Sequence, residues 1–386
     1  MKRRRATVLL SALALVGAGL AVAVPSLTAN PAVAAEACGS GSFQAEVVKS
    51  GSTWTARNGS RTVYTGSDML SAVQGGINSL TANRTAKERV VVRGDGSMPA
   101  NQRIRMASYT TLDFCGTITT TGSGATDMAP IYGRGITDVE VQHLNVKGAP
   151  WYGIFMRQVN NLTLGQITMD LPGGGIGVRV DNNNATAFSR NFTLDTLSVQ
   201  NAGSHALETY GIDGVKVGTV TARNVGESGV LLNRTINATI GTVDAENAGA
   251  GTGYAAFRMA NRNGLVGSSY PTNIKVGTVK ARGGGRGIFC VSESGGATID
   301  KVDISGTGNN AVLIENCHNV DIAPGGGTIA GPGNVRLAAR SEFANNTGIT
   351  LRNFTLSNSS LVENPCVSGG LSYSGVKVSN SSVSRC

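Results

Sequence analysis

The sequence predicts an all-β solenoid, a coil of short parallel strands with about 23 residues in each turn. Three observations predict it. The phrase Val-Gly-Thr-Val, with its variants, recurs at a fixed phase along the chain. An Asn or a Gly stands three positions before six of the seven copies. Apolar residues then alternate with polar ones in three short runs per unit, which is the period of a strand.

The repeat has seven anchors, spaced by 23 residues or by 23 plus an insertion. The clearest copies begin at Val217, Ile240 and Val276, and the weaker ones at Val141, Leu164, Leu194 and Ile299. The turn residues that precede six of them can adopt left-handed conformations at little cost; they are Asn161, Asn191, Gly214, Asn237, Asn273 and Gly296, and the same column continues at Asn319. One unit cannot bury its apolar side chains alone, so the units must stack, and we expect eight to ten coils.

Composition limits the classes of protein to which the chain can belong. Of its 386 residues, 53 are Gly and only 15% are charged, with a mean hydropathy near zero, which excludes a disordered chain. The glycines follow no three-residue period, which excludes collagen. The net charge of +9 suits an acidic substrate, but the chain lacks the dense basic stripe that a nucleic-acid-binding protein needs.

Residues 1–34 have the pattern of a secretory signal peptide. Basic residues 2–5 precede an apolar run over residues 8–24 and a small-residue cleavage site at Ala32-Val33-Ala34. A membrane anchor is the alternative, but the run is short for a span and rich in Ala and Gly. We therefore expect a secreted, extracellular protein with no membrane segment after cleavage, and a monomer.

The six cysteines all follow the signal, and an even number in an exported chain predicts three disulfides. None lies in a Cys-x-x-Cys pair, so zinc or redox chemistry is not expected. Cys290 and Cys317 fall on consecutive coils, and we predict a bond between them. The remaining bonds, Cys38–Cys115 and Cys366–Cys386, would fix the two ends of the chain.

The segments of the mature chain differ in pattern. Residues 35–110 are expected to form an amino-terminal cap and the first coils, 111–346 the parallel β-helix, and 347–386 a final coil and disulfide-pinned tail. The cap should contain a helix with Ser67 as its N-cap and one apolar face, where it would cover the open end of the coil. That face is Met69, Leu70, Val73, Ile77 and Leu80.

The helix is followed by Arg89-Val-Val-Val-Arg-Gly-Asp-Gly and then by Arg103-Ile-Arg-Met-Ala-Ser-Tyr-Thr-Thr-Leu-Asp. With the 23-residue repeat, this opening resembles the pectate-lyase-like superfamily over residues 45–360. The resemblance implies a right-handed, single-stranded parallel β-helix that acts on or binds carbohydrate. The chain lacks the Asn-Thr-Asp, Asp-Asp and Gly-His-Gly motifs of polygalacturonases and the signature of pectate lyases, so the family within the superfamily is left open.

Strand alternation predicts which side chains of the third run in each unit point outward. Successive coils are ~4.8 Å apart, so Arg179 should neighbour Glu208, and Arg258 should lie two coils, ~10 Å, beyond Glu208. The expected outward residues are Phe155, Arg157, Arg179, Asp181, Glu208, Tyr210, Leu231, Asn233, Arg258, Cys290, Ser292, Leu313 and Glu315.

Two insertions, at residues 181–190 and 261–271, follow this outward face on either side of two uninserted coils. They predict a groove whose floor carries Glu208, Tyr210, Asn233 and Arg234, with His205 in the turn just before it. A groove between long loops on a regular scaffold suits a polymeric ligand.

The arginine-rich face favours a polysaccharide lyase that cleaves a uronic-acid-containing polymer by β-elimination. That reaction needs a base at C5, a cation for the carboxylate and a donor for the leaving oxygen. We expect Glu208 and Arg258 to be required, with Tyr210 or His205 carrying the proton. The expected substrate-binding residues are Arg157, Arg179, Asp181, Asn233, Arg234, Asn261, Arg262 and Arg286.

Other interpretations remain open from the sequence. Asp181 and Glu208 on adjacent coils could serve as the carboxylate pair of a glycoside hydrolase. The same fold could be a non-catalytic carbohydrate-binding or adhesive module, and the charged column could be a surface ion-pair ladder of small energetic value. No metal or cofactor is expected, with calcium near Asp181, Glu208 and Asp213 as the alternative.

Overall fold

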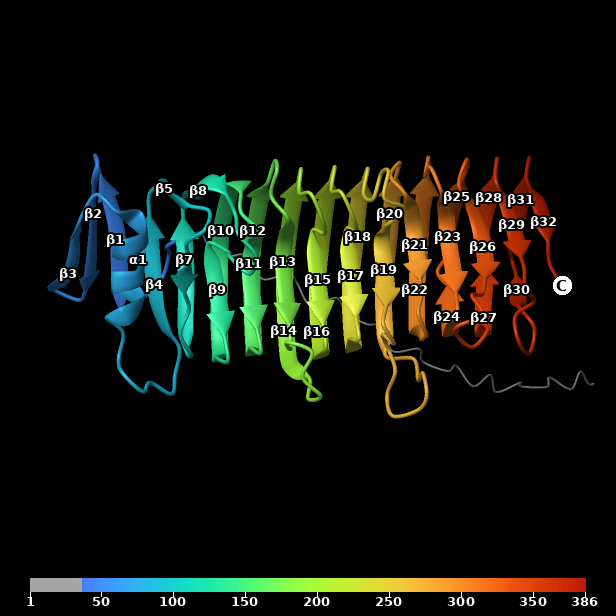
Figure 1. The fold of residues 1–386 in the computed structure, drawn as a ribbon, viewed down its shortest axis with the longest axis horizontal. Helices are drawn as coiled ribbons and strands as arrows, with labels where there is room; N and C mark the ends of the chain where they lie inside the picture. Colours follow the sequence, from blue (N-terminus) through green and yellow to red (C-terminus); the bar gives the residue numbers. More distant parts are fainter. Residues whose placement is uncertain (1–36) are drawn as a thin grey trace, which may run out of the picture. The chain divides into compact units, whose positions relative to one another are not determined.

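The structure, a computed structural model, describes residues 37–386, so the expected signal peptide lies outside the described residues. The described chain is nearly all β and forms a parallel β-solenoid of about 13 turns with roughly 23 residues per turn (Figure 1). This confirms the predicted parallel β-helix. The expected number of coils, eight to ten, was wrong because the terminal coils lack the Val-Gly-Thr-Val phrase from which the coils were counted.

One face of the solenoid is a parallel sheet of twelve strands, stacked in chain order (Figure 1). Each strand belongs to a different coil. They are β6 (Ile104–Arg105), β9 (Ile131–Arg134), β11 (Tyr152–Arg157), β13 (Ile176–Asp181), β15 (Leu207–Tyr210), β17 (Val230–Asn233), β19 (Ala255–Ala260), β21 (Arg286–Cys290), β23 (Asn310–Glu315), β26 (Asn334–Ala338), β29 (Ser360–Glu363) and β32 (Ser382–Ser384).

The remaining strands form a twenty-stranded sheet that makes up the other sides. Its pairings are parallel except at β1–β2 and β2–β3. Its strands are β1 (Ala45–Ser50), β2 (Thr53–Asn58), β3 (Arg61–Gly66), β4 (Glu88–Arg93), β5 (Gly96–Pro99), β7 (Thr110–Cys115), β8 (Thr117–Ser123), β10 (Thr137–Ala149), β12 (Asn160–Asp170), β14 (Ser189–Gln200), β16 (Ile212–Arg223), β18 (Ile236–Glu246), β20 (Ile274–Arg282), β22 (Ser294–Ser305), β24 (Cys317–Ile322), β25 (Gly327–Ala330), β27 (Thr347–Arg352), β28 (Phe354–Ser357), β30 (Ser372–Ser374) and β31 (Lys377–Ser379).

The recurring Val-Gly-Thr-Val phrase lies within the long strands of this sheet. Val217 pairs with Ile240 and Ile240 with Val276, as the 23-residue phase predicted. A side chain at Gly241 would come within 2.6 Å of the Gly218 carbonyl oxygen of the preceding coil, so only glycine fits the stacked bend. The bend does not end the strand: two of the three expected runs join into single strands such as β16.

The column of turn residues is a ladder, as the sequence indicated. Asn161, Asn191 and Asn237 have φ of 54°, 61° and 54°, in the left-handed region. The Asn191 side-chain amide donates to the Asn161 amide oxygen at 2.8 Å. Each coil thereby positions the turn of the next, which keeps the strands in register along the solenoid.

The amino-terminal cap contains helix α1 (Met69–Asn78). Its N-cap is Asp68, whose carboxylate accepts a 2.6 Å hydrogen bond from the Ser71 backbone N–H, so the expected Ser67 cap was off by one residue. Met69, Val73 and Ile77 are buried, as the helical spacing predicted. The antiparallel strands β1–β3 precede the helix, and β1 pairs in parallel with β4, which extends the coil sheet into the cap.

All three predicted disulfides are present: Cys38–Cys115, Cys290–Cys317 and Cys366–Cys386. Cys290 and Cys317 are both fully buried inside the coil. The expected outward position of Cys290 was therefore wrong. The turn before β21 shifts the alternation by one residue, so Phe289 and Val291 form the outer cluster instead. No helix within residues 37–386 is long and apolar enough to cross a membrane.

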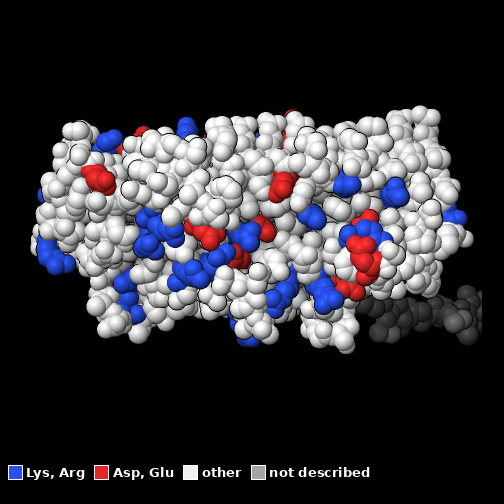
Figure 2. Space-filling view, in the orientation of Figure 1, with Lys and Arg blue, Asp and Glu red and all other residues white. Residues whose placement is uncertain are grey.

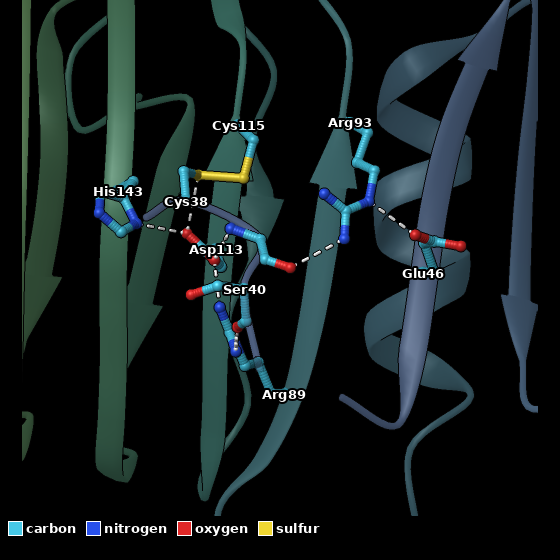
Figure 3. Close-up of a disulfide and its surroundings, with 9 residues drawn as sticks. Cys38, Ser40, Glu46, Arg89, Arg93, Asp113, Cys115 and His143 are labelled. Atoms are coloured by element: carbon cyan, nitrogen blue, oxygen red, sulfur yellow. Dashed lines mark hydrogen bonds and ion pairs between the residues drawn. A yellow bond between two sulfur atoms is a disulfide. The ribbon is translucent and has the colours of Figure 1, made fainter. Parts of the chain in front are cut away.

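Gly39, near the start of the described residues, is fastened to the coil around a buried carboxylate, Asp113 (Figure 3). Asp113 accepts hydrogen bonds from the Gly39 backbone at 2.7 Å, from Arg89, and from His143 Nδ1 at 2.7 Å. Burial opposes its ionisation, but these three partners together lower the pKa of Asp113. The neighbouring Cys38 sulfur is in a disulfide, so the group of Cys38, Asp113 and His143 lacks a thiolate for a metal.

Replacing Asp113 with asparagine should lower the free energy of unfolding by about 3–5 kcal/mol, because it leaves the Arg89 guanidinium without its buried counter-charge. Since the folded pKa of Asp113 lies below its unfolded value, the lost stability is present above about pH 4 and fades as pH falls. Denaturant titration at neutral pH measures it. The exposed Asp195→Asn is the control; an equal change in both variants would contradict the prediction.

Candidate functional site

The predicted site lies on the outer face of the twelve-stranded sheet, where basic and acidic side chains gather along the middle of the face in Figure 2. The strand register agrees with the sequence spacing. Arg179 pairs with Glu208, and Glu208, Leu231 and Arg258 occupy one column on β15, β17 and β19. Loops over residues 182–188 and 261–273 follow β13 and β19 and extend past the strand ends on either side of β15 and β17 (Figure 1).

Four charged side chains form one bonded row across β11, β13 and β15. Arg157 donates to both oxygens of Asp181, at 2.8 and 2.9 Å. Arg179 bridges the two acids, with Nε at 2.9 Å from Asp181 and Nη1 at 2.6 Å from Glu208. Arg157 and Arg179 therefore already have carboxylate partners, and Asp181 is only 2% exposed.

The row continues through two amides. Asn233 donates to Glu208 at 2.9 Å, and Asn261 donates to the Asn233 amide oxygen at 2.9 Å. The two acids of the row differ in electrostatics. Burial raises the pKa of Glu208 against the opposing effects of Arg179 and Asn233. Burial also opposes ionisation of Asp181, but the hydrogen bonds from Arg157 and Arg179 outweigh it and lower the pKa of Asp181.

Arg258, in contrast, forms no ion pair within residues 37–386. Its guanidinium lies 4.5 Å from the centroid of the Tyr254 ring and 5.1 Å from that of Phe289. Its Nε is buried without a hydrogen-bond partner. Stacking between two rings fixes the direction of the guanidinium and leaves its charge uncompensated, which is the state that a carboxylate ligand requires.

Tyr210 and His205, the two candidate proton carriers, differ in accessibility. Tyr210 lies on β15 in register with Asp181 and Asn233, is partly exposed, and its hydroxyl has no hydrogen-bond partner among the described residues. His205 is 5% exposed and both of its ring nitrogens are engaged. Nδ1 accepts the Ser228 backbone N–H at 2.9 Å, and Nε2 lies 3.0 Å from a Glu227 oxygen.

These contacts define the state of the His205 ring. Because Nδ1 accepts a hydrogen bond, the single proton of the neutral ring is on Nε2 and is donated to Glu227. Burial, aided by the charges of Arg258 and Arg179, lowers the pKa of His205 to about 3. Only Tyr210 therefore presents a free proton-carrying group at the surface of this strand.

His205 should make the protein less stable as the pH falls through the weakly acidic range. The unfolded side chain gains a proton below about pH 6.5, whereas the folded one does so only near pH 3, so the unfolding free energy rises with pH between these values. The contribution should be about 2–3 kcal/mol between about pH 4.5 and 6.5. The raised pKa of Glu208 acts in the opposite direction.

The comparison variant is therefore His205→Asn, whose Oδ1 can still accept the Ser228 N–H. Urea unfolding of both proteins across this range isolates the His205 contribution from that of Glu208. Parallel pH profiles for the wild type and His205→Asn would contradict a neutral, buried His205.

The other predicted binding residues have partners in the structure. Arg234 donates to the carbonyl oxygens of Ala185 and Thr186, which ties the first loop to the end of β17. Arg262 pairs with Glu293 at 3.0 Å on the second loop. Arg286 donates to Asn310 at 2.8 Å and stacks on Phe289. Arg234 and Arg262 thus shape the loops, and Arg286 supports the ring beside Arg258.

The carboxylates do not present the free oxygen ligands that calcium prefers. Asp181 uses both oxygens on arginines, and Glu208 accepts from Arg179 and Asn233. Asp213 belongs to the turn ladder, where it accepts from Asn237 at 2.7 Å. The residues present at this face do not fit a calcium site.

Two features of the face were missed in the sequence. Glu227 accepts from both Ser204 and His205, and it lies 23 residues after Ser204, so the repeat period could have indicated this contact. The rings of Tyr254 and Phe289 around Arg258 had no such signal, because the turn before β19 breaks the regular count.

No protein-family model and no curated protein sequence matches the chain. Among solved structures it is similar to the A-module of the mannuronan C-5 epimerase AlgE4 from Azotobacter vinelandii, with a TM-score of 0.57 at 12% identity, covering 82% of this chain and 94% of that one. The AlgE6 A-module from the same organism gives a TM-score of 0.48 at 14% identity, covering 83% and 96%. At such identities, the likeness to the AlgE4 module establishes the parallel β-helix fold that the two chains share.

Proposed function

We propose that this protein is a secreted enzyme that removes the C5 proton of a uronate residue in an acidic polysaccharide and cleaves the chain by β-elimination. The observation that carries the proposal is Arg258, a cation held between two aromatic rings without a carboxylate partner. In the same outward face lie Glu208 and the free hydroxyl of Tyr210. Three disulfides are typical of proteins that mature in an oxidising compartment, which supports the secreted location.

Each residue has a defined part in this reaction. Arg258 pairs with the uronate carboxylate, which lowers the cost of the negative charge that develops when C5 loses its proton. Tyr210, acting in its phenolate form, takes that proton and becomes a neutral phenol; the C4–O bond breaks, and a C4–C5 double bond forms. The leaving oxygen receives a proton from Tyr210 or from water. Glu208, held by Arg179 and Asn233, positions the residues around Tyr210.

Epimerisation at C5 is the second candidate. It is favoured by the similarity in fold to the AlgE4 module, which is named as part of a mannuronan C-5 epimerase. It begins with the same removal of the C5 proton, but a proton then returns to C5 from the opposite face and the chain stays intact. The two reactions share the removal of the C5 proton, so the same residues serve this first step in both. Elimination then breaks the C4–O bond, whereas epimerisation needs a proton donor on the opposite face of the sugar.

The geometry gives less support to hydrolysis by Asp181 and Glu208. A hydrolytic pair needs space between its carboxyl groups for the sugar and the water. The Arg179 guanidinium lies between these two acids, bonded to both. A carbohydrate-binding module without catalysis would use the same arginines but would give no product.

The proposal is tested with a panel of uronic-acid polymers, including mannuronan. We expect ultraviolet absorbance from unsaturated ends, or inverted C5 stereochemistry by NMR, on at least one acidic polymer. Arg258→Ala should reduce kcat/KM by about 10²-fold or more, as loss of a charge-stabilising group does. Arg336→Ala, an exposed arginine three coils further along the same face, is the control and should retain activity. New reducing ends without unsaturation would contradict the proposal.

A further inference from the structure

The outward column that contains Arg179 and Glu208 continues beyond the candidate site toward the amino terminus. Arg105 on β6 is in register with Tyr132 on β9, and Tyr132 with Phe155 on β11. Phe155 is in turn in register with Arg179. The same face therefore carries three further outward positions that the proposed reaction does not use.

These positions are aromatic and basic. Tyr132, Tyr152 and Phe155 form an apolar cluster on the outside of the coil, separate from its interior core. The ring centroids of Tyr152 and Phe155 are 4.6 Å apart, and those of Tyr132 and Phe155 are 5.7 Å apart. Trp151, next to this cluster in the chain, is 43% exposed, although large apolar side chains are otherwise buried in most of the coil.

Among the arginines that lie over this aromatic cluster, Arg103 and Arg105 have no carboxylate partner, unlike Arg157 and Arg179, which lie over Phe155 and Tyr152. The Arg103 guanidinium lies 4.2 Å, and that of Arg105 5.9 Å, from the Tyr132 ring centroid. Arg134 is exposed and lies in register with Arg157. None of the three forms an ion pair within the described part of the chain, whereas Arg157 and Arg179 on the next two strands do.

The spacing of this surface matches a chain of sugar residues. From Glu208 to Tyr132 is three strand spacings, ~14 Å, and to Arg105 four, ~19 Å. One monosaccharide of an extended chain spans a length similar to one strand spacing, ~5 Å. Three or four uronate residues on one side of the reacting residue would therefore extend from Glu208 to Arg105.

The geometry points to a second binding region for the polymer, which we call the amino-terminal arm: Arg103, Arg105, Tyr132, Arg134 and Trp151. The arginines of the arm pair with uronate carboxylates, and the Trp151 ring stacks on a sugar face. The assignment of the ligand as a uronate chain rests on the proposed function. The arm sets the length of chain that is bound and the side of the reacting residue on which it extends.

Tryptophan fluorescence reports on the arm directly, because the chain has only two tryptophans and Trp54 is buried in the cap. The probes are oligouronates of two to six residues, a neutral oligosaccharide of equal length, and single-stranded DNA. We expect the oligouronates to change the fluorescence and to protect Trp151 from acrylamide, with affinity that rises with length. The neutral oligomer should have no effect.

The double variant Arg105→Ala/Arg134→Ala should lose about tenfold or more in affinity for the hexamer but little for the dimer. The charge-matched control is Lys216→Ala/Lys275→Ala, two exposed lysines on the twenty-stranded sheet, which should bind as the wild type does. Equal losses of affinity for the dimer and the hexamer would contradict the proposed role of the amino-terminal arm. Equal affinities for DNA and for the oligouronates would also contradict it.

Failure of the arm and failure of the proposed function are distinguishable, because fluorescence needs no turnover. If oligouronates bind at Trp151 with an affinity that rises with their length but no product forms, the arm is a binding region and the proposed reaction is wrong. If a uronate polymer is turned over while Trp151 fluorescence stays unchanged and the arm variants keep wild-type activity, the proposed reaction stands and the arm is not a binding region.

Discussion

Glu208→Gln is expected to lower turnover of the acidic polymer by about 10²-fold or more. Glu208 is 5% exposed and joins Arg179 to Asn233, so it holds the row of side chains beside Tyr210 in one geometry. An amide can accept from only one of these two donors and presents an N–H to the other. Misplacement of reacting groups by about 1 Å suffices for a loss of this size.

The same substitution should leave the melting temperature within about 3 °C of the wild type. Because burial raises the pKa of Glu208, the folded protein disfavours its charge, and a neutral isostere removes that cost. The matched control is Glu315→Gln, an outward acid on β23 that pairs with Arg340 at 2.8 Å. It should keep wild-type activity. If Glu208→Gln keeps full activity, or if it unfolds, the charged column that contains Glu208 is better explained as a surface ion-pair ladder with no role in catalysis.

Tyr210→Phe should lower kcat by about 10²–10⁴-fold, the usual contribution of a general acid or base. The substitution removes one hydroxyl that no described residue hydrogen-bonds, so stability should be unaffected. KM should change little, because the carboxylate contact belongs to Arg258. Steady-state rates and thermal melts of the same preparations separate the two effects.

His205→Asn is the companion variant, because the sequence left Tyr210 and His205 as equal candidates. Both His205 nitrogens are bonded, to Ser228 and Glu227, and the ring is neutral. We expect His205→Asn to retain activity within about tenfold of the wild type, in the range below the usual contribution of an acid or base. A full loss in His205→Asn with an active Tyr210→Phe would assign the proton transfer to His205.

The sequence could predict the stacking because a solenoid repeats one structural solution. Once Val217 and Ile240 occupy equivalent positions, every outward neighbour on the coils between insertions follows by counting, and Glu208 indeed pairs with Leu231. Counting failed where turns vary in length. At β21 the inward–outward alternation is shifted by one residue from the expected phase. Cys290 therefore points into the core, and Phe289 and Val291 point outward.

The partners of the long side chains could not be predicted in the same way. Alternation indicates that Arg157, Arg179 and Arg258 point outward, but not which of them reaches a carboxylate. That depends on rotamers and on neighbours from adjacent coils. The structure pairs Arg157 and Arg179 with acids and leaves Arg258 between two rings, which separates structural arginines from the candidate ligand-binding one.

The most direct test of the account is solvent exchange at C5 of an oligouronate incubated in D₂O, followed by NMR. The account predicts removal of the C5 proton, seen as deuterium at C5 or as an unsaturated C4–C5 end, with wild-type protein and with Glu315→Gln. Neither signal should form at an appreciable rate with Tyr210→Phe. A bound oligouronate whose C5 proton is retained in intact chains, or chains cut to saturated reducing ends with that proton retained, would contradict C5 chemistry at this face.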